Sequence, residues 1–319
     1  MLRPYLAVAG GPMAGTVELG AGDDAALWRS GAQGAVAVTT DSLVEDVHFR
    51  RPADTAAAQD LGWKLLAISY SDLAAMGARP GPAFISLSLP GTWEVAWVEA
   101  LYQGLVELVA AHGGGLAGGN ITAAKGAVLT SSCLGEVDAS MAMRRQGAEP
   151  GWLLAVTGEV GGAAAALRGK PEEAWRRRLA RPQPRLSAGA MAAELGVHTA
   201  IDISDGLFAD AARLLGGAAS GGSIDTVAIG VTIDAAAIPA APGIRERWPR
   251  DWLDVAGGGE DYELLLAGSP QVLKPALLAI EAAGTPARVI GSFDRGEGVR
   301  VLVAGEERPA PEVGHQHFG

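Results

Sequence analysis

The order of apolar and polar positions predicts alternating strands and helices in the first half of the chain. An apolar run at residues 35–39 predicts a buried strand, and alternation of apolar with small polar residues predicts a half-buried strand at 83–89. Helical spacing is found at residues 60–76 and 92–112, and a glycine that favours helix termination follows each segment. Thr92 is the expected N-cap of the second helix. The predicted apolar stripe of this helix consists of Val95, Val98, Leu101, Leu105 and Leu108.

The second half of the chain has a similar mixed order. A strand is expected at residues 153–157, a helix at 162–167, and a strand that ends at 201–203 and leads into a helix. The arginine run at 176–178 is interpreted as the solvated face of a helix. Further strands are predicted at residues 227–233, 262–266, 287–290 and 299–303. This order favours an α+β fold over an uninterrupted series of βαβ units.

Length and composition describe a well-packed globular protein with two domains. A chain of 319 residues is too long for a single small core. A crossover that contains glycine, proline and arginine divides the chain into expected domains at residues 1–140 and 141–319. The residues are 49% hydrophobic and 19% charged, which excludes a disordered chain. The net charge of −11 argues against a nucleic acid partner, and a polyanionic ligand must therefore bind together with cations.

No segment of the sequence indicates secretion or membrane insertion. The one cysteine, Cys133, lies in a strand-like run, where we expect a buried thiol, and a single cysteine excludes a disulfide framework. No apolar stretch has the length of a membrane-spanning helix, and the run at residues 5–9 is too short for the core of a signal peptide. We expect a cytoplasmic protein.

The aspartates suggest the chemistry, because several stand within apolar runs or at their ends. Two carboxylates about 5 Å apart repel each other by roughly 3 kcal/mol at an effective dielectric constant of about 20. A site that gathers four or more must bind something strongly positive, and Mg²⁺ prefers oxygen ligands together with substrate phosphates. The sequence therefore predicts a magnesium-dependent enzyme that acts on phosphates. The residues concerned are Asp23, Asp24, Asp41, Asp72, Asp202 and Asp205.

Asp72 is the clearest single candidate. Leu61, Leu65, Ile68, Asp72 and Met76 follow helical spacing and share one face. A carboxylate in such a stripe costs several kcal/mol unless it is paired or binds a metal. A functional carboxylate is the favoured interpretation, over one that caps a loop or pairs with an arginine.

Two glycine-rich segments are followed by acidic residues. Residues 20–25 nearly match the dinucleotide-binding fingerprint, but their two aspartates would repel a pyrophosphate, so we interpret these aspartates as metal ligands after a tight turn. The glycines at 257–259 allow a ligand to approach the backbone closely, and Glu260 then lies at the mouth of a strand. A plain flexible loop is an equal alternative for this second segment.

Polar residues also occupy two strand ends. Residues 39–41 (Thr-Thr-Asp) end a buried strand, where their oxygens can join a metal shell. Residues 202–205 form a strand-to-helix corner, with Ser204 or Asp205 as the expected cap, and a phosphate can lie at such a helix N-terminus beside a cation. The chain has no Walker A motif, so any use of ATP must rely on a different architecture.

Five sequence blocks, spread in order over nearly the whole chain, form a specific combination. They comprise residues 22–25, 39–44 with His48-Phe49, 71–78, 202–207 and 258–264. With these blocks the chain resembles the thiamine-monophosphate kinases, a family in the superfamily of aminoimidazole ribonucleotide synthetase and selenophosphate synthetase. The resemblance implies an N-terminal mixed sheet with helices that dimerises through the sheet, a C-terminal α/β sandwich, and an active site between them.

The resemblance also implies a reaction and its residues. The family transfers a phosphoryl group from ATP to thiamine monophosphate, which gives ADP and thiamine diphosphate, and it uses several Mg²⁺ ions. The acceptor oxygen is already ionised at neutral pH, so neither a general base nor a covalent intermediate is required. Asp72 and Asp205 are the implied catalytic residues. The implied Mg²⁺ ligands are Asp24, Thr39, Thr40, Asp41, Asp72, Asn120, Asp202 and Asp205; the ATP contacts are Gly119, Asn120, Arg145 and Ser204; and the thiamine contacts are His48, Glu260 and His315.

Three residues depart from the family pattern. Asn120 stands where the family has an aspartate, and its uncharged amide oxygen is expected to bind one cation more weakly. Trp152 replaces an aspartate in a turn. His315 replaces an aromatic residue that would face the thiamine, and an imidazole offers less area for stacking.

Two alternatives remain open. One is another ATP-dependent enzyme of the same superfamily, although no cysteine lies near the N-terminal glycine loop, which disfavours a selenophosphate synthetase. The other is a catalytically impaired paralogue that binds nucleotide, which the departures at Asn120 and His315 suggest.

Overall fold

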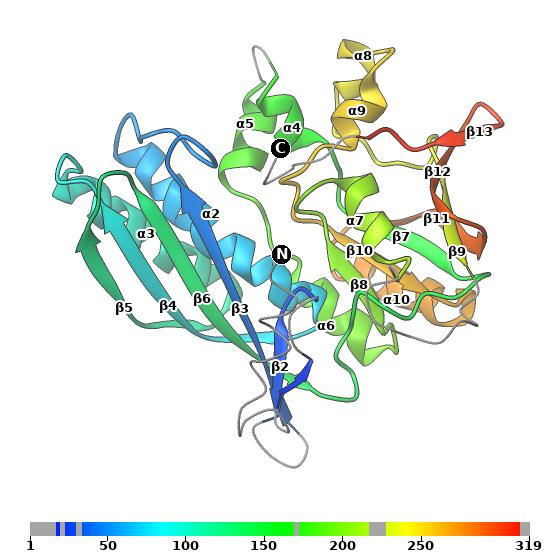
Figure 1. The fold of residues 1–319 in the computed structure, drawn as a ribbon, viewed down its shortest axis with the longest axis horizontal. Helices are drawn as coiled ribbons and strands as arrows, with labels where there is room; N and C mark the ends of the chain where they lie inside the picture. Colours follow the sequence, from blue (N-terminus) through cyan, green and yellow to red (C-terminus); the bar gives the residue numbers. More distant parts are fainter. Residues whose placement is uncertain (1–16, 20–22, 30–33, 169–171, 217–227, 313–319) are drawn as a thin grey trace.

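The computed structural model describes residues 17–19, 23–29, 34–168, 172–216 and 228–312, and their strands form two sheets (Figure 1). The first sheet has the order β1-β2-β3-β6-β4-β5, and the second has the order β13-β12-β9-β11-β7-β10-β8. The β4–β5 and β9–β12 pairs are parallel, and the other strand pairs of the described chain are antiparallel. Mainly antiparallel sheets with packed helices confirm the predicted α+β class.

The element bounds follow the chain. The strands of the first sheet are β1 (Val17–Leu19), β2 (Ala26–Arg29), β3 (Gly34–Val44), β4 (Arg79–Leu89), β5 (Gly115–Ala123) and β6 (Val128–Asp138). Those of the second are β7 (Leu153–Thr157), β8 (Thr199–Asp202), β9 (Ile229–Asp234), β10 (Leu264–Gly268), β11 (Ala287–Arg295), β12 (Gly298–Val303) and β13 (Glu306–Pro309). The helices are α2 (Thr55–Ala75), α3 (Val95–His112), α4 (Gly162–Ala166), α5 (Glu173–Ala180), α6 (Leu186–Glu194), α7 (Leu207–Arg213), α8 (Ile244–Arg247), α9 (Trp252–Ala256) and α10 (Pro270–Ala282).

Helices α2 and α3 cover one face of the first sheet (Figure 1). Burial alternates along β3, so that Ala35, Ala37 and Leu43 face the helices. The alternate residues, such as Thr40 and Ser42, point the other way. We call this second side the open face. Its residues in the described chain include Trp28, Thr40, Ser42, Phe84, Ser86, Ser88, Thr130, Ser132 and Asn120, which share it by strand register.

Helix α2 is the element that joins the two halves of the molecule. The Asp54 side chain caps its start by accepting the Ala57 N–H at 2.8 Å, and Gly77, with a φ of 69°, follows its end. Besides α3 and the first sheet, α2 contacts α6 and β8 of the second half. A Cβ on Gly189 of α6 would lie 2.0 Å from the Ala74 carbonyl oxygen, so this helix contact requires glycine.

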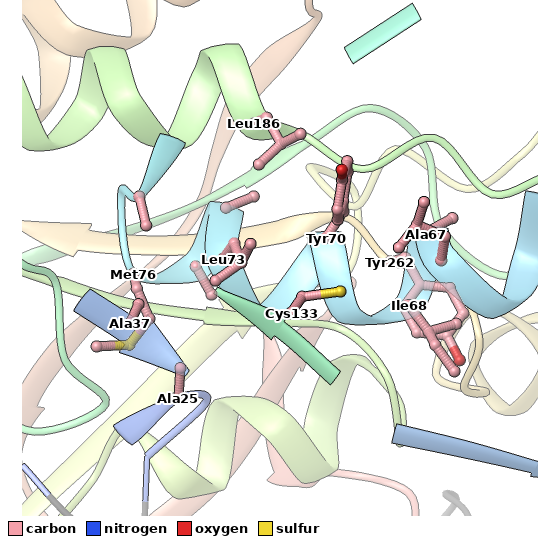
Figure 2. Packing of buried hydrophobic residues seen from close by; sticks show 14 of the residues in the cluster. Ala25, Ala37, Ala67, Ile68, Tyr70, Leu73, Met76, Cys133, Leu186 and Tyr262 are labelled. Atoms are coloured by element: carbon pink, nitrogen blue, oxygen red, sulfur yellow. The ribbon is translucent and has the colours of Figure 1, made fainter. Parts of the chain in front are cut away.

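One hydrophobic core therefore spans both halves. Figure 2 shows Tyr70 and Leu73 of α2, with its C-cap Met76, in the same buried cluster as Leu186 and Tyr262 from the second half. The predicted boundary between residues 140 and 141 falls between β6 and β7, but packing continues across it. Cys133 is buried, as expected.

Three helix starts differ from the expectation, and the first is that of α2, which begins at Thr55 and not at residue 60. The Trp93 N–H binds the Pro90 carbonyl in a turn, so α3 begins at Val95 with Glu94 as its N-cap, and Thr92 does not cap it. Val95 of the predicted apolar stripe is 74% exposed for the same reason, whereas Leu101, Leu105 and Leu108 are buried as predicted and Val98 is partly buried. Helix α7 has Gly206 as its N-cap, without a side-chain cap from Ser204 or Asp205.

No helix in the described ranges combines the length and the apolar character that crossing a membrane requires.

Candidate active site

A cleft of about 780 Å³ lies where β3 and α2 meet the loops of the second half. Seven of the lining residues are acidic, and three arginines also face the cleft. The lining includes Asp24, Thr39, Thr40, Asp41, His48, Asp72, Arg145, Arg168, Asp202, Ser204, Asp205, Arg213, Asp254, Gly258, Gly259, Glu260 and Tyr262.

Four carboxylates from distant segments meet in this cleft, and we call Asp24, Asp41, Asp72 and Asp202 the acidic cluster. One oxygen from each of Asp24, Asp72 and Asp202 lies within 4.8 Å of the others. The second oxygen of Asp24, Oδ2, is buried and has no hydrogen-bond partner in the described part of the chain. Oxygen donors at this spacing, one of them unsatisfied, suit a hard divalent cation.

Burial and mutual repulsion raise the pKa values of Asp41, Asp72 and Asp202. Burial raises the pKa of Asp72 well above its usual value, and the charges of Asp41, Asp202 and Asp24 raise it further. Burial likewise raises the pKa of Asp202, with Asp24 as the next cause. The pKa of Asp41 is also raised by burial. A bound cation would reverse this balance by favouring the ionised carboxylates.

Hydroxyl groups orient three of these carboxylates. The Thr39 hydroxyl donates to Asp72, Ser69 donates to Asp41 at 2.9 Å, and Ser71 donates to Asp202 at 2.8 Å. Ser69 and Ser71 were not identified from the sequence. Their signal is two hydroxyls beside Asp72 in an otherwise apolar helix segment, where such residues need buried partners.

Arg145 links the start of the chain to the crossover between the two halves. Its backbone N–H donates to Asp23, at 3.1 Å to the nearer oxygen, and its guanidinium donates to Asp24 at 2.7 Å. Burial would lower the pKa of Arg145, but the hydrogen bond and charge of Asp24 raise it above its usual value. The guanidinium Nε is buried and unpaired among the described residues.

The glycine run at 257–259 allows its loop to pack closely against residues 203–205 at the cleft. A Cβ on Gly259 would lie 2.5 Å from the Ser204 carbonyl oxygen. Beyond the run, the Glu260 N–H donates to Ser204 at 2.8 Å and the Tyr262 N–H donates to Ile203 at 2.8 Å. Glu260 and Tyr262 have φ values of 69° and 52°, a conformation that costs free energy in non-glycine residues and concentrates at functional sites. The loop is therefore ordered by pairing with residues 203–204.

The side chain of Asp210 fixes the corner that leads into α7. It is fully buried, and its Oδ2 accepts the N–H groups of Asp205 at 3.0 Å and Gly206 at 2.9 Å. Arg213 pairs with both Asp210 and Asp205. Burial raises the pKa of Asp210 to about 6. Asp210 therefore holds Asp205 in place, a role that the sequence did not reveal.

Besides Arg145 with Asp24, three ion pairs are called the wall pairs. The carboxylates of the pairs Lys64 with Glu260 and Arg213 with Asp205 line the cleft, and the carboxylate of the third pair, Arg185 with Glu263, follows the lining residue Tyr262 in sequence. Glu263 also accepts from the Thr157 hydroxyl at 2.7 Å. Each pair neutralises its carboxylate with a cation of the protein.

Most of the predicted site residues come together in the cleft, with a few exceptions. Thr40 is part of the cleft lining, but its hydroxyl lies on the open face, where it pairs with Ser132 at 2.9 Å. Gly119 and Asn120 lie on the exposed edge strand β5 and do not line the cleft. His315 lies outside the described residues. His48 lines the cleft, and its Nδ1 accepts the Val44 N–H at 3.1 Å.

Comparison with known proteins shows that the N-terminal part of the chain is similar to a broad class, the proteins related to AIR synthase. The sequence model of "AIR synthase related protein, N-terminal domain" matches residues 22–137. A thiamine-monophosphate kinase of Mycobacterium tuberculosis is 37% identical over 311 residues, which cover 95% of this chain and 87% of that protein. One from Escherichia coli O157:H7 is 34% identical and covers 95% of this chain and 92% of that protein. This chain belongs to the thiamine-monophosphate kinase family.

Solved structures agree with this assignment. The crystal structure of thiamine-monophosphate kinase from Stenotrophomonas maltophilia K279a superimposes with a TM-score of 0.75 at 34% identity, covering 96% of each chain. AaThiL complexed with AMPPCP and TMP gives a TM-score of 0.81 at 26% identity, covering 99% of this chain and 96% of that chain.

Proposed function

We propose that this protein transfers the γ-phosphoryl group of ATP to the phosphate of thiamine monophosphate, with Mg²⁺, and releases ADP and thiamine diphosphate. The observation that carries the proposal is the meeting of Asp24, Asp72 and Asp202 within 4.8 Å in one cleft, although about 50 and 130 residues separate them in sequence. The names of the similar proteins support the substrate, and the complex of AaThiL with AMPPCP and TMP supports a site for two anionic ligands.

The chemistry requires alignment rather than activation of a nucleophile. An oxygen of the acceptor phosphate attacks the γ-phosphorus, and the bond from this phosphorus to the β–γ bridging oxygen breaks as ADP leaves. Mg²⁺ would neutralise the phosphate charges when bound to the acidic cluster. Ser69, Ser71 and Thr39 keep the carboxylates oriented for this role. Arg145 and Ser204 are the proposed ATP contacts, and His48 and Glu260 the proposed acceptor contacts.

A discontinuous assay tests the proposal. The purified protein is incubated with ATP, Mg²⁺ and thiamine monophosphate, and ADP and thiamine diphosphate are quantified by chromatography. Equal amounts of the two products that depend on Mg²⁺ and on the acceptor phosphate are expected, and thiamine should not replace the monophosphate. ATP binding without turnover would favour a catalytically impaired paralogue. ADP without thiamine diphosphate would point to another acceptor.

We also propose that two copies pair through the open face of the first sheet. Large exposed apolar side chains on a sheet face favour an interface there, and Trp28 and Phe84 on the open face are 39% and 43% exposed in the single chain. Sedimentation should show a dimer, and Phe84→Glu should weaken it at least tenfold. Val106→Glu, on the outer surface of α3, is the matched control and should leave the dimer intact. A monomeric wild type would contradict this part of the proposal.

The proposed dimer also gives a reason for the position of Asn120 outside the cleft of its own chain. Asn120 aligns with Ser86 in the β4–β5 register and so lies on the open face, away from the cleft of its own chain. In a dimer it would approach the partner chain, and we propose that it contributes to a cation or nucleotide contact there. Asn120→Asp should then lower the Mg²⁺ concentration for half-maximal rate, and an unchanged value would remove Asn120 from any cation site.

A protein that uses ATP in this way is proposed to be cytoplasmic.

A further inference from the structure

Lys64 is a buried lysine whose charge the proposed reaction does not use. Its side chain is 6% exposed, and its ammonium group donates to Glu260 Oε2 at 2.7 Å. A buried ammonium group without a partner would cost several kcal/mol. The contact joins α2 to a loop 196 residues further along the chain, which is why sequence reasoning did not find it.

The pair stands between two hollows of the protein. Glu260 lines the main cleft, whereas Lys64 lines a smaller recess of about 360 Å³. The two spaces share His48 and Leu179 in their linings. Most of the recess wall is apolar, with Phe49, Pro52, Ala53, Ala57, Leu61 and Ala180 in its lining.

Glu260 is held so that one carboxylate oxygen is engaged and the other is available. Its backbone is fixed by the hydrogen bond to Ser204 and by the left-handed φ of 69°. Lys64 binds Oε2, and none of the described hydrogen bonds uses Oε1. The Glu260 side chain is 24% exposed, in contrast to 6% for Lys64, so the carboxylate is the partner that can meet a ligand.

We infer that Lys64 is a positioning residue for the acceptor. It fixes Glu260 so that Oε1 faces the ring portion of the substrate, which is cationic and carries N–H groups. This inference rests on the proposed function, because the thiazolium ring of thiamine monophosphate is a permanent cation and its pyrimidine carries an amino group. Without Lys64, the carboxylate must give up rotational freedom when the acceptor binds, and that entropic cost weakens binding. Lys64 acts through Glu260 and does not touch the reacting phosphates.

Lys64→Met tests this role because it keeps the apolar stem and removes the ammonium group. The KM for thiamine monophosphate should rise about tenfold, which corresponds to loss of one charge-assisted contact. The turnover number and the KM for ATP should stay within about threefold. Lys64→Arg keeps a charged donor and should recover part of the loss. Lys274→Met, which removes an exposed lysine on α10, is the matched control and should change nothing.

A double-mutant cycle separates positioning from a general structural role. Glu260→Gln should also raise the KM for the acceptor, and Lys64→Met should add little in that background because its effect passes through Glu260. Independent, multiplying effects would overturn the inference, as would an unchanged KM in Lys64→Met or an equal rise in the KM for ATP.

Calorimetry keeps this test distinct from that of the proposed reaction. Binding of thiamine monophosphate is measured with Mg²⁺ and a non-hydrolysable ATP analogue in the wild type and in Lys64→Met. A wild type that binds but does not turn over contradicts the reaction alone, and an affinity that falls about tenfold in the variant still supports the role of Lys64. Equal affinities, or no binding by the wild type, overturn the inference.

Discussion

The acidic cluster and the wall pairs both contain carboxylates with little exposure, but their charges are balanced differently. Each wall carboxylate contacts an arginine or a lysine, as Glu263 does with Arg185. In the acidic cluster, Asp72 and Asp202 accept hydrogen bonds from hydroxyls, and no arginine or lysine of the described chain forms a salt bridge with either. Arg185 neutralises Glu263 within the protein. Asp72 and Asp202 receive only hydroxyl donors, so their charge is left for a cation from solution.

Asp72→Asn should have the largest effect on activity. The amide can still accept from Thr39, but it removes one negative charge from the proposed metal site, so turnover should fall by about two to three orders of magnitude. The metal-free variant should be at least as stable as the wild type, because burial raises the pKa of Asp72 and ionised Asp72 is costly without a cation. Product formation and thermal melting measure the two effects. Asp251→Asn, at an exposed position before α9, is the control, and near-normal turnover in Asp72→Asn would refute the metal role.

Arg185→Gln should show the opposite profile. It leaves Glu263, a buried carboxylate, without its cation, and the free energy of unfolding should fall by about 3 kcal/mol. Turnover per folded molecule should change only a few-fold. Urea unfolding gives the stability, with the exposed Arg176→Gln as the control. If activity falls by orders of magnitude while stability is kept, the division between cluster and wall is wrong.

Addition of Mg²⁺ tests the cluster without a mutation. A ligand at about 100 times its dissociation constant stabilises the folded state by about 2.7 kcal/mol, so the melting temperature of the wild type should rise by several degrees and fall again with a chelator. Asp72→Asn should lose most of this rise. Arg185→Gln should keep it, since neither Arg185 nor Glu263 is among the expected ligands of the ion. An equal rise in all three proteins would place the ion outside the cluster.

The smallest expected effect concerns Asp261, a carboxylate beside the wall pairs. Its Oδ2 accepts the Gly161 N–H at 2.6 Å, and burial raises its pKa to about 8. Because the pKa in the folded state lies well above the ordinary aspartate value of 3.8, the folded protein favours the protonated form, and stability should decrease as pH rises from about 4 and level off above about 8. Asp261→Asn should reduce the difference in melting temperature between about pH 6 and pH 9. An unchanged difference would show that Asp261 ionises without cost.

The sequence predicted elements that are rich in buried apolar residues and missed elements that are not. Helix α2 was found from the helical spacing of its large apolar residues, and strand β7 from its short apolar run. Strand β5 was missed because it is rich in glycine, lies at an edge and has little buried surface, so it carries no alternation. Helix α10 contains Pro275, which weakens a helical prediction even though the helix is formed.

The candidate site could be predicted where single residues break an apolar pattern. Asp72 and Asp202 stand out because a carboxylate in such a context needs a reason. Lys64, Arg185 and Asp210 could not be identified, because their roles depend on contacts that only the folded chain creates. Thr40 shows the converse limit: alternation along β3 turns its side chain away from its neighbours Thr39 and Asp41.

The packing of α2 against both halves has a consequence for protein engineering. If the C-terminal half were exchanged for that of a relative, one side of the cleft would have to pack against an α2 helix from a different protein. The close approach of Gly189 to Ala74 would then have to be reproduced between the two parents. Functional hybrids should therefore be obtained most readily when α2 and α6 are inherited together from one parent.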